Sequence, residues 1–229
     1  GERLHFHRQV HGTGVTIVSG GPAAPRTPAR WRALDPWAAP ESDILISDRP
    51  GVALVLSVAD CCPVLLYAPA ASVVAAVHAG WRGTAAGAVT VAVEALRTRF
   101  GVDPRGLRGW IGPCAGPRSY EVGPEVVRRF DAYPDCLKPS GKEGHALLNL
   151  PEVNRRRLIE GGMLPNRIEL SGIDTIADRR FHSYRRDGRS SGRMAAWIGL
   201  SASHTEPSHR RPTPRPWGIP GAPVTQPPA

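Results

Sequence analysis

A cysteine and a histidine stand in polar-flanked turns beside two apolar runs, within the stretch Val58–Gly83. Cys61 follows Asp60, and His78 is the first residue of the segment HAGWRG. Thiolate and imidazole groups together serve two kinds of chemistry, namely binding of a soft metal ion and nucleophile–base catalysis. Because few other roles require both groups beside buried strands, this stretch makes the chain an enzyme candidate.

Two further segments carry suitable groups, His11 in QVHG and Cys114 in GPC. His11, Cys61 and His78 would make a zinc site with three protein ligands and a fourth position for water, whose pKa the metal would lower. Alternatively, Cys61 is a nucleophile activated by His78, with Asp60 or another carboxylate orienting the imidazole. Each residue taken alone is also typical of a buried structural position. The wide spacing of these residues leaves both mechanisms open.

The chain carries an excess of positive charge, with 29 Lys and Arg against 20 Asp and Glu, a net charge of +9 and a pI near 10.2. This excess favours anionic partners, although a solvated basic face is its commoner meaning. Since no nucleic-acid motif accompanies the charge, we expect no nucleic-acid partner. Arg82 and Arg185, in glycine-bounded turns, are candidates for binding phosphate or substrate, and each would equally suit hydrogen bonds to loop carbonyls.

Hydrophobic periodicity predicts alternating strands and helices, which is typical of an α/β protein. The predicted strands are 43–47, 51–58, 63–67, 73–77, 107–111, 168–170 and 194–200. On this pattern, Cys61 and His78 lie just beyond strand ends, where open α/β sheets bind ligands. Thr84 is the predicted N-cap of a helix with an apolar face that ends at Gly101. Two more helices are predicted to begin at Pro124 and Pro151.

The composition changes near residue 200. Residues 1–200 have the pattern of one folded domain, whereas 201–229 form a Pro/Arg-rich tail that we expect to be disordered. A role as a scaffold acting through this tail is a non-enzymatic alternative. Four cysteines are too few for a disulfide framework and are expected to be reduced. No segment has the length and hydropathy of a membrane span or a secretory signal, so we expect a cytoplasmic protein without a membrane partner.

Six segments together resemble one known family. They occur in the order QVHG, ADCCPV, HAGWRG, WIGPCAGPRSYEVG, LNLPEVNRRRL and FHSYRRDGRSSGRMAAW. This series is similar to the laccase-domain family, also called the multicopper polyphenol oxidase or purine nucleoside phosphorylase family, from about His5 to Leu200. The resemblance implies a single domain of layered mixed β-sheets flanked by helices (α+β). It also implies an N-terminal segment before QVHG that this sequence does not include.

The resemblance implies a metal site formed by His11, Cys61 and His78, and it makes Cys62 a packing residue. It implies zinc-dependent phosphorolysis of adenosine, inosine, guanosine and methylthioadenosine, together with deamination of adenosine. Purine nucleosides and phosphate would then be the partners. The alternatives are a copper-dependent polyphenol oxidase and a cysteine hydrolase that edits peptidoglycan precursors. Laccase chemistry needs several copper ions and many histidines, and this chain has only eight, so copper oxidation is the weaker hypothesis.

Overall fold

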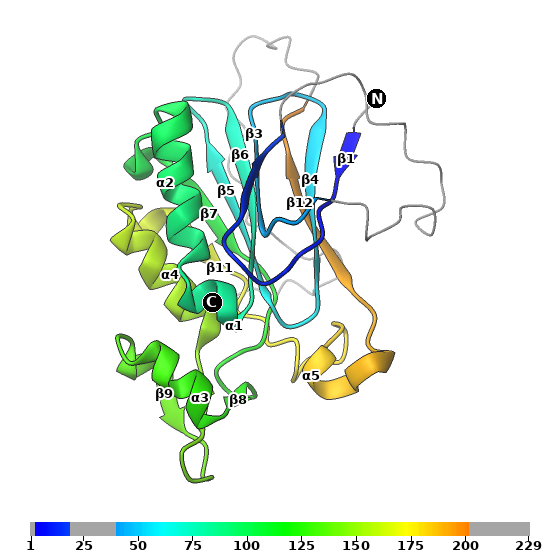
Figure 1. Ribbon diagram of the computed structural model, residues 1–229, viewed down its shortest axis with the longest axis vertical. Helices are drawn as coiled ribbons and strands as arrows, with labels where there is room; N and C mark the ends of the chain where they lie inside the picture. The colour runs from blue at the N-terminus through cyan, green and yellow to red at the C-terminus, as the bar shows by residue number, and fades with distance from the viewer. Residues whose placement is uncertain (1–2, 19–39, 202–229) are drawn as a thin grey trace, which may run out of the picture.

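The computed structural model describes residues 3–18 and 40–201, and its central feature is a six-stranded mixed sheet (Figure 1). The strands, in spatial order, are β11 (Ile168–Leu170), β7 (Arg108–Ile111), β5 (Cys62–Ala68), β6 (Val73–Ala79), β3 (Ile44–Ser47) and β2 (Val15–Ile17). The inner pairs are antiparallel, whereas the outer pairs β11–β7 and β3–β2 are parallel. The strands predicted at 63–67 and 73–77 are therefore confirmed as the neighbours β5 and β6, joined by a short turn.

A second sheet covers one face of the first (Figure 1). It consists of β1 (Arg3–His5), β4 (Val52–Val58) and β12 (Met194–Gly199), in that order. Side chains alternate between the faces of a strand, so Leu45 and Val74 pack toward Leu54 and Leu56 of this second sheet. The intervening residues of β3 and β6 belong to the core on the opposite face. Because both faces of β3 and β6 are covered, the sequences of these two strands are continuous apolar runs.

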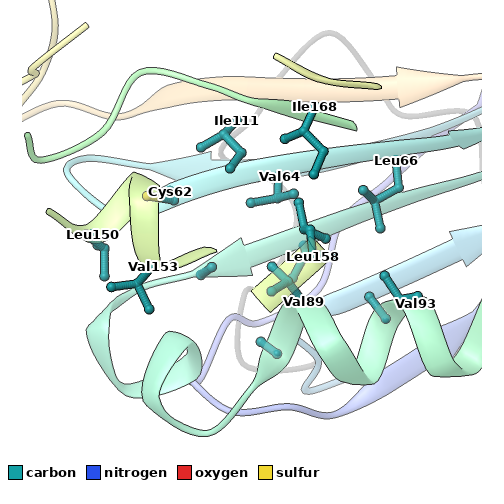
Figure 2. Packing of buried hydrophobic residues seen from close by; sticks show 14 of the residues in the cluster. Cys62, Val64, Leu66, Val89, Val93, Ile111, Leu150, Val153, Leu158 and Ile168 are labelled. Carbon is teal, nitrogen blue, oxygen red and sulfur yellow. The ribbon is translucent and has the colours of Figure 1, made fainter. Parts of the chain in front are cut away.

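Two helices, α2 (Ala88–Phe100) and α4 (Leu150–Glu160), cover that opposite face. Figure 2 shows Val89 and Val93 of α2 and Leu158 of α4 with Val64 and Leu66 of β5 in one cluster. The predicted ends are confirmed: α2 stops at Gly101, which has a φ of 64°, and α4 begins with Pro151 in its first turn. The side chain of Asn149 caps α4 by accepting a hydrogen bond from the Glu152 N–H.

The prediction that Thr84 caps a long helix is wrong. A short helix, α1 (Trp81–Ala85), comes first, and α2 starts only after Gly87, whose φ of 83° breaks the helical path. Thr84 lies inside α1, is fully buried, and accepts a hydrogen bond of 3.0 Å from the side-chain amide of Asn154. Its hydroxyl is therefore engaged with the interior rather than with the free N–H groups of a helix start.

Short elements surround one end of the main sheet, and among them only the helix that begins at Pro124 was predicted. A third sheet has the order β8 (Glu121–Val122), β10 (Ala146–Leu148) and β9 (Leu137–Pro139). Helices α3 (Pro124–Val127) and α5 (Tyr184–Asp187) lie at the same end (Figure 1). Of the 3₁₀ turns, η3 (Arg128–Phe130) follows α3, η4 (Pro134–Cys136) precedes β9 and η6 (Gly188–Ser190) follows α5. The turns η2 (Pro104–Gly106) and η5 (Pro165–Arg167) precede β7 and β11, at the opposite end of the main sheet. Strands of two or three residues are too short to show a periodic pattern.

The expected single α+β domain of mixed sheets and helices is confirmed. The tail predicted at 201–229 lies outside the described residues after residue 201. Within the described residues, no helix has the length and apolar character needed to cross a membrane.

Candidate metal centre

The pairing of β5 with β6 brings Cys61 and His78 together. Cys62 lies opposite Ala79 and Pro63 lies opposite His78, so the start of β5 and the end of β6 share one edge of the sheet. Cys61 lies in the turn that follows β4 and immediately precedes β5, so its predicted position beyond the end of a strand is confirmed. His78 differs from that prediction, because it is the penultimate residue of β6 and is almost fully buried.

His11 completes the group from the loop between β1 and β2. Its backbone has a φ of 61°, a left-handed conformation that few residues other than glycine adopt. Its ring centroid lies 4.9 Å from that of His78, with the ring planes at 70°. One ligand atom from each of His11, Cys61 and His78 lies within 4.8 Å of the others, which places the three predicted ligands around a common point.

Asp43, which no motif of the sequence indicates, holds two of these histidines in place. Its carboxylate is fully buried directly before β3 and accepts four hydrogen bonds. Three come from backbone N–H groups of the His11 loop, at 3.2 Å from Val10, 3.0 Å from His11 and 2.7 Å from Gly12. The fourth joins Oδ1 to Nδ1 of His78 at 2.7 Å. Since Nδ1 is engaged, Nε2 of His78 is the nitrogen left for a ligand role, as in carboxylate–histidine–metal arrangements.

The electrostatics of this pair follow from its partners. Burial by itself would raise the pKa of Asp43, but hydrogen bonds from His78 and from the Gly12 and His11 backbone outweigh it and lower the pKa. Burial, and next the neighbouring His78, lower the pKa of His11. A neutral imidazole is the form that binds a metal ion. The one signal for Asp43 in the sequence is an acidic residue directly before the apolar run ILIS.

Gly80 of HAGWRG makes room for the cluster. A Cβ atom at this position would lie 2.8 Å from Sγ of Cys61 and 3.0 Å from Cδ2 of His11. Both distances are too short for ordinary contact, so a larger residue would displace the two side chains. Glycine is thus required here by close approach rather than by backbone conformation.

Asp60 anchors the turn that carries Cys61 and does not orient His78. Its φ is 82°, its Oδ1 accepts a 2.7 Å hydrogen bond from the Thr175 hydroxyl, and its Oδ2 accepts one of 2.6 Å from the Arg185 N–H. These bonds tie the turn to segments more than 100 positions later in the chain. Of the two options left open by the sequence, the orienting carboxylate is therefore the other one, Asp43.

The thiols have distinct environments. Burial, followed by the charge of Asp60, raises the pKa of Cys61 to about 12, so without a cation this thiol is protonated at neutral pH. A reactive cysteine needs the opposite environment, whereas a metal ion would supply the missing positive charge. Cys62 is fully buried in the core and hydrogen-bonded to Cys114, in keeping with a packing residue (Figure 2). All four cysteines are free thiols.

A small pocket of about 70 Å³ opens onto the cluster. It is lined by His11, Asp60, Cys61, Gly80, Trp81, Arg82, Tyr120 and Leu150. Arg82 thus reaches the site as a lining residue, with its guanidinium 4.3 Å from the centre of the Trp81 ring. Arg185 does not line this pocket; its guanidinium lies 5.0 Å from the centre of the Tyr120 ring and donates a hydrogen bond to the Glu121 carbonyl.

The fold and site together define an α+β protein with a candidate metal centre of two histidines and one cysteine at one edge of its main sheet. The three side chains suit a zinc or copper ion, because neutral imidazole and thiolate are ligands of both metals. Residues 1–201 match the family described as multi-copper polyphenol oxidoreductase laccase, and the chain belongs to that family.

Named relatives and solved structures agree with this assignment. Purine nucleoside phosphorylase of Xylella fastidiosa (strain Temecula1) is 40% identical over 201 residues, which cover 85% of this chain and 72% of the relative. Purine nucleoside phosphorylase YfiH of Escherichia coli (strain K12) is 34% identical over 198 residues, with coverages of 84% and 72%. The structure of the Bacillus licheniformis hypothetical protein YfiH superposes with a TM-score of 0.79 at 35% identity, over 86% of this chain and 74% of the other.

Proposed function

We propose that this chain is a metal-dependent purine nucleoside phosphorylase that also deaminates adenosine. Its relatives named purine nucleoside phosphorylase support the first activity. The observation that carries the metal dependence is the convergence of His11, Cys61 and His78 on one point beside a pocket lined by Arg82. The proposed substrates are adenosine, inosine, guanosine and methylthioadenosine, with phosphate or water as the second reactant.

The reaction fits the groups that line the pocket. In phosphorolysis, a phosphate oxygen forms a bond to the sugar C1′, the bond from C1′ to the purine nitrogen breaks, and the base leaves after gaining a proton. A guanidinium such as that of Arg82 binds phosphate through paired N–H donors. Arg185 is the second proposed substrate contact; its guanidinium lies against the ring of Tyr120, which lines the pocket, and would contact the ribose or phosphate from that side. In deamination, water adds at the purine carbon and ammonia leaves.

Zinc is the proposed metal, held by His11, Cys61 and His78. When bound, it supplies a Lewis acid beside the reacting atoms. Asp43 keeps the His78 ring and the His11 loop in the ligand-binding orientation, and Gly80 leaves the space for the Cys61 sulfur. A zinc enzyme is preferred over a multicopper oxidase because, among residues 3–18 and 40–201, His11, Cys61 and His78 form the one group of three or more donors close enough to hold an ion. A multicopper oxidase needs several such groups.

The cysteine hydrolase is the second candidate, since Cys61, His78 and Asp43 have the order of a nucleophile, a base and an orienting acid. The raised pKa of Cys61 weighs against it. We place the activity in the cytoplasm, because four free thiols suit a reducing compartment.

The test is release of hypoxanthine from inosine by the full chain, with and without phosphate and after removal of metal by a chelator. We expect base release that requires both phosphate and metal, and loss of activity in His78→Ala. A zinc-loaded, folded protein that releases no base in the presence of phosphate would refute the proposal. Activity that survives metal removal but not alkylation of Cys61 would support the hydrolase instead.

A further inference from the structure

A second and larger hollow adjoins the metal pocket. It has a volume of about 470 Å³ and is lined by Trp81, Arg82, Ala85, Arg128 and Arg129. We call it the arginine groove. Trp81 and Arg82 line both spaces, so the groove and the pocket meet at these two residues. At about 70 Å³ the pocket has little room beyond an ion and a few atoms, whereas the groove lies within the size range of small-molecule sites, about 300–1,000 Å³.

The two walls of the groove come from firmly held elements. α1 follows β6 directly and contributes Trp81, Arg82 and Ala85. The facing wall is the 3₁₀ turn Arg128–Phe130, whose end is anchored by the fully buried ring of Phe130. Arg128 and Arg129 themselves are exposed, so the core fixes the turn while both guanidinium groups remain at the surface.

The charge of the arginine groove is not neutralised. No carboxylate lines it, and within the described part of the chain Arg82, Arg128 and Arg129 form no ion pair. Other surface arginines differ in this respect, since Arg97 pairs with Glu94 and Arg180 with Asp178. Three positive groups around one hollow repel one another and together attract an anion.

We propose that Arg128 and Arg129, acting with Arg82, bind a phosphate group in the arginine groove. A guanidinium presents parallel N–H donors that match phosphate oxygens, and several arginines match the double negative charge better than they match a single carboxylate. Trp81 and Arg82 line both the groove and the metal pocket, so a phosphate held here lies beside the metal pocket. The group belongs either to inorganic phosphate or to a phosphate ester on a nucleoside. The proposal rests on the proposed function only in assigning the bound phosphate to phosphorolysis. Phosphate binding itself can be measured whether or not the chain catalyses a reaction.

The test is calorimetric titration of the metal-loaded full chain with inorganic phosphate, with AMP and with adenosine. The variant is R128Q/R129Q, and the matched control is R99Q/R105Q, which removes the same charge from exposed residues outside the groove. Arg99 lies at the end of α2 that is remote from α1. Circular dichroism shows whether each variant is folded. We expect R128Q/R129Q to weaken phosphate binding at least tenfold and the control to change it less than twofold.

The three ligands distinguish the source of the phosphate group. If inorganic phosphate binding depends on Arg128 and Arg129 and AMP binds no better than adenosine, the ligand is free phosphate. If AMP binds more tightly than adenosine and R128Q/R129Q removes that advantage, it is a phosphate ester. The proposal is overturned if neither ligand binds at millimolar concentration, if R128Q/R129Q leaves both affinities within twofold, or if the control weakens them equally. Inactivity toward inosine with intact phosphate binding would refute the proposed function alone.

Discussion

Replacing Asp43 with asparagine should weaken zinc binding at the candidate metal centre and lower the stability of the fold, because this one carboxylate holds both the His11 loop and the His78 ring. Its two oxygens accept four hydrogen bonds, two each. Asparagine keeps one oxygen and replaces the other with an NH₂ group, which donates. Whichever way the amide turns, two N–H donors will face another donor inside a fully buried site.

The size of the effect follows from these contacts. Loss of a residue that orients a metal-binding histidine costs about 10–100-fold in metal affinity, which corresponds to about 1.4–2.8 kcal/mol. Each hydrogen bond to a charged group contributes about 1.5–3 kcal/mol, so two lost bonds lower the free energy of unfolding by about 3–6 kcal/mol. That is a large part of the usual 5–15 kcal/mol, and the experiment is best done at low temperature on protein shown to be folded.

The assay is a zinc titration in competition with a chromophoric chelator, combined with urea unfolding. Asp174→Asn is a matched control, since Asp174 is also buried and accepts hydrogen bonds from Ser119 and from backbone N–H groups but lies outside the metal cluster. We expect the control to lower stability and to leave zinc affinity nearly unchanged. If folded Asp43→Asn binds zinc as tightly as the unchanged chain, the assigned role of Asp43 is wrong.

Three further predictions concern the same centre. Gly80→Ala should abolish stoichiometric zinc binding in elemental analysis, because its Cβ would lie 2.8 Å from the Cys61 sulfur, whereas Gly106→Ala, which has open space, should bind zinc normally. Cys61→Ala should lose the metal and, when both proteins are compared metal-free, have nearly the same free energy of unfolding as the unchanged chain. Cys62→Ala should keep the metal and lower the free energy of unfolding by about 1–2 kcal/mol through a core cavity; the reverse pattern would contradict the assignment. Removal of zinc by a chelator should lower the thermal midpoint, since a ligand at a thousandfold excess over its Kd stabilises the native state by about 4 kcal/mol. An unchanged midpoint would count against a metal site of that affinity.

The elements that support the site are largely readable from local sequence. Alternation and apolar runs predict β4 to β7, because a side chain that faces a covered sheet surface must be apolar wherever it lies in the chain. Proline at a first turn and glycine after a last turn mark α4 and the end of α2, because these residues act through their own backbone. Thr84 shows the limit of such reasoning, since its hydroxyl has a partner 70 positions away.

The sequence by itself determined which residues can carry the chemistry: His11, Cys61 and His78 were identified by residue type, by glycine-rich turns and by resemblance to a family. Only the tertiary structure decided what surrounds them. Asp43 reaches His78 across 35 positions because β3 pairs with β6. Arg128 and Arg129 face Arg82 because a buried phenylalanine fixes their turn beside α1. Hydrogen bonds and charge clusters depend on distances in space, and local periodicity shows which face a residue occupies but not which segment lies against it.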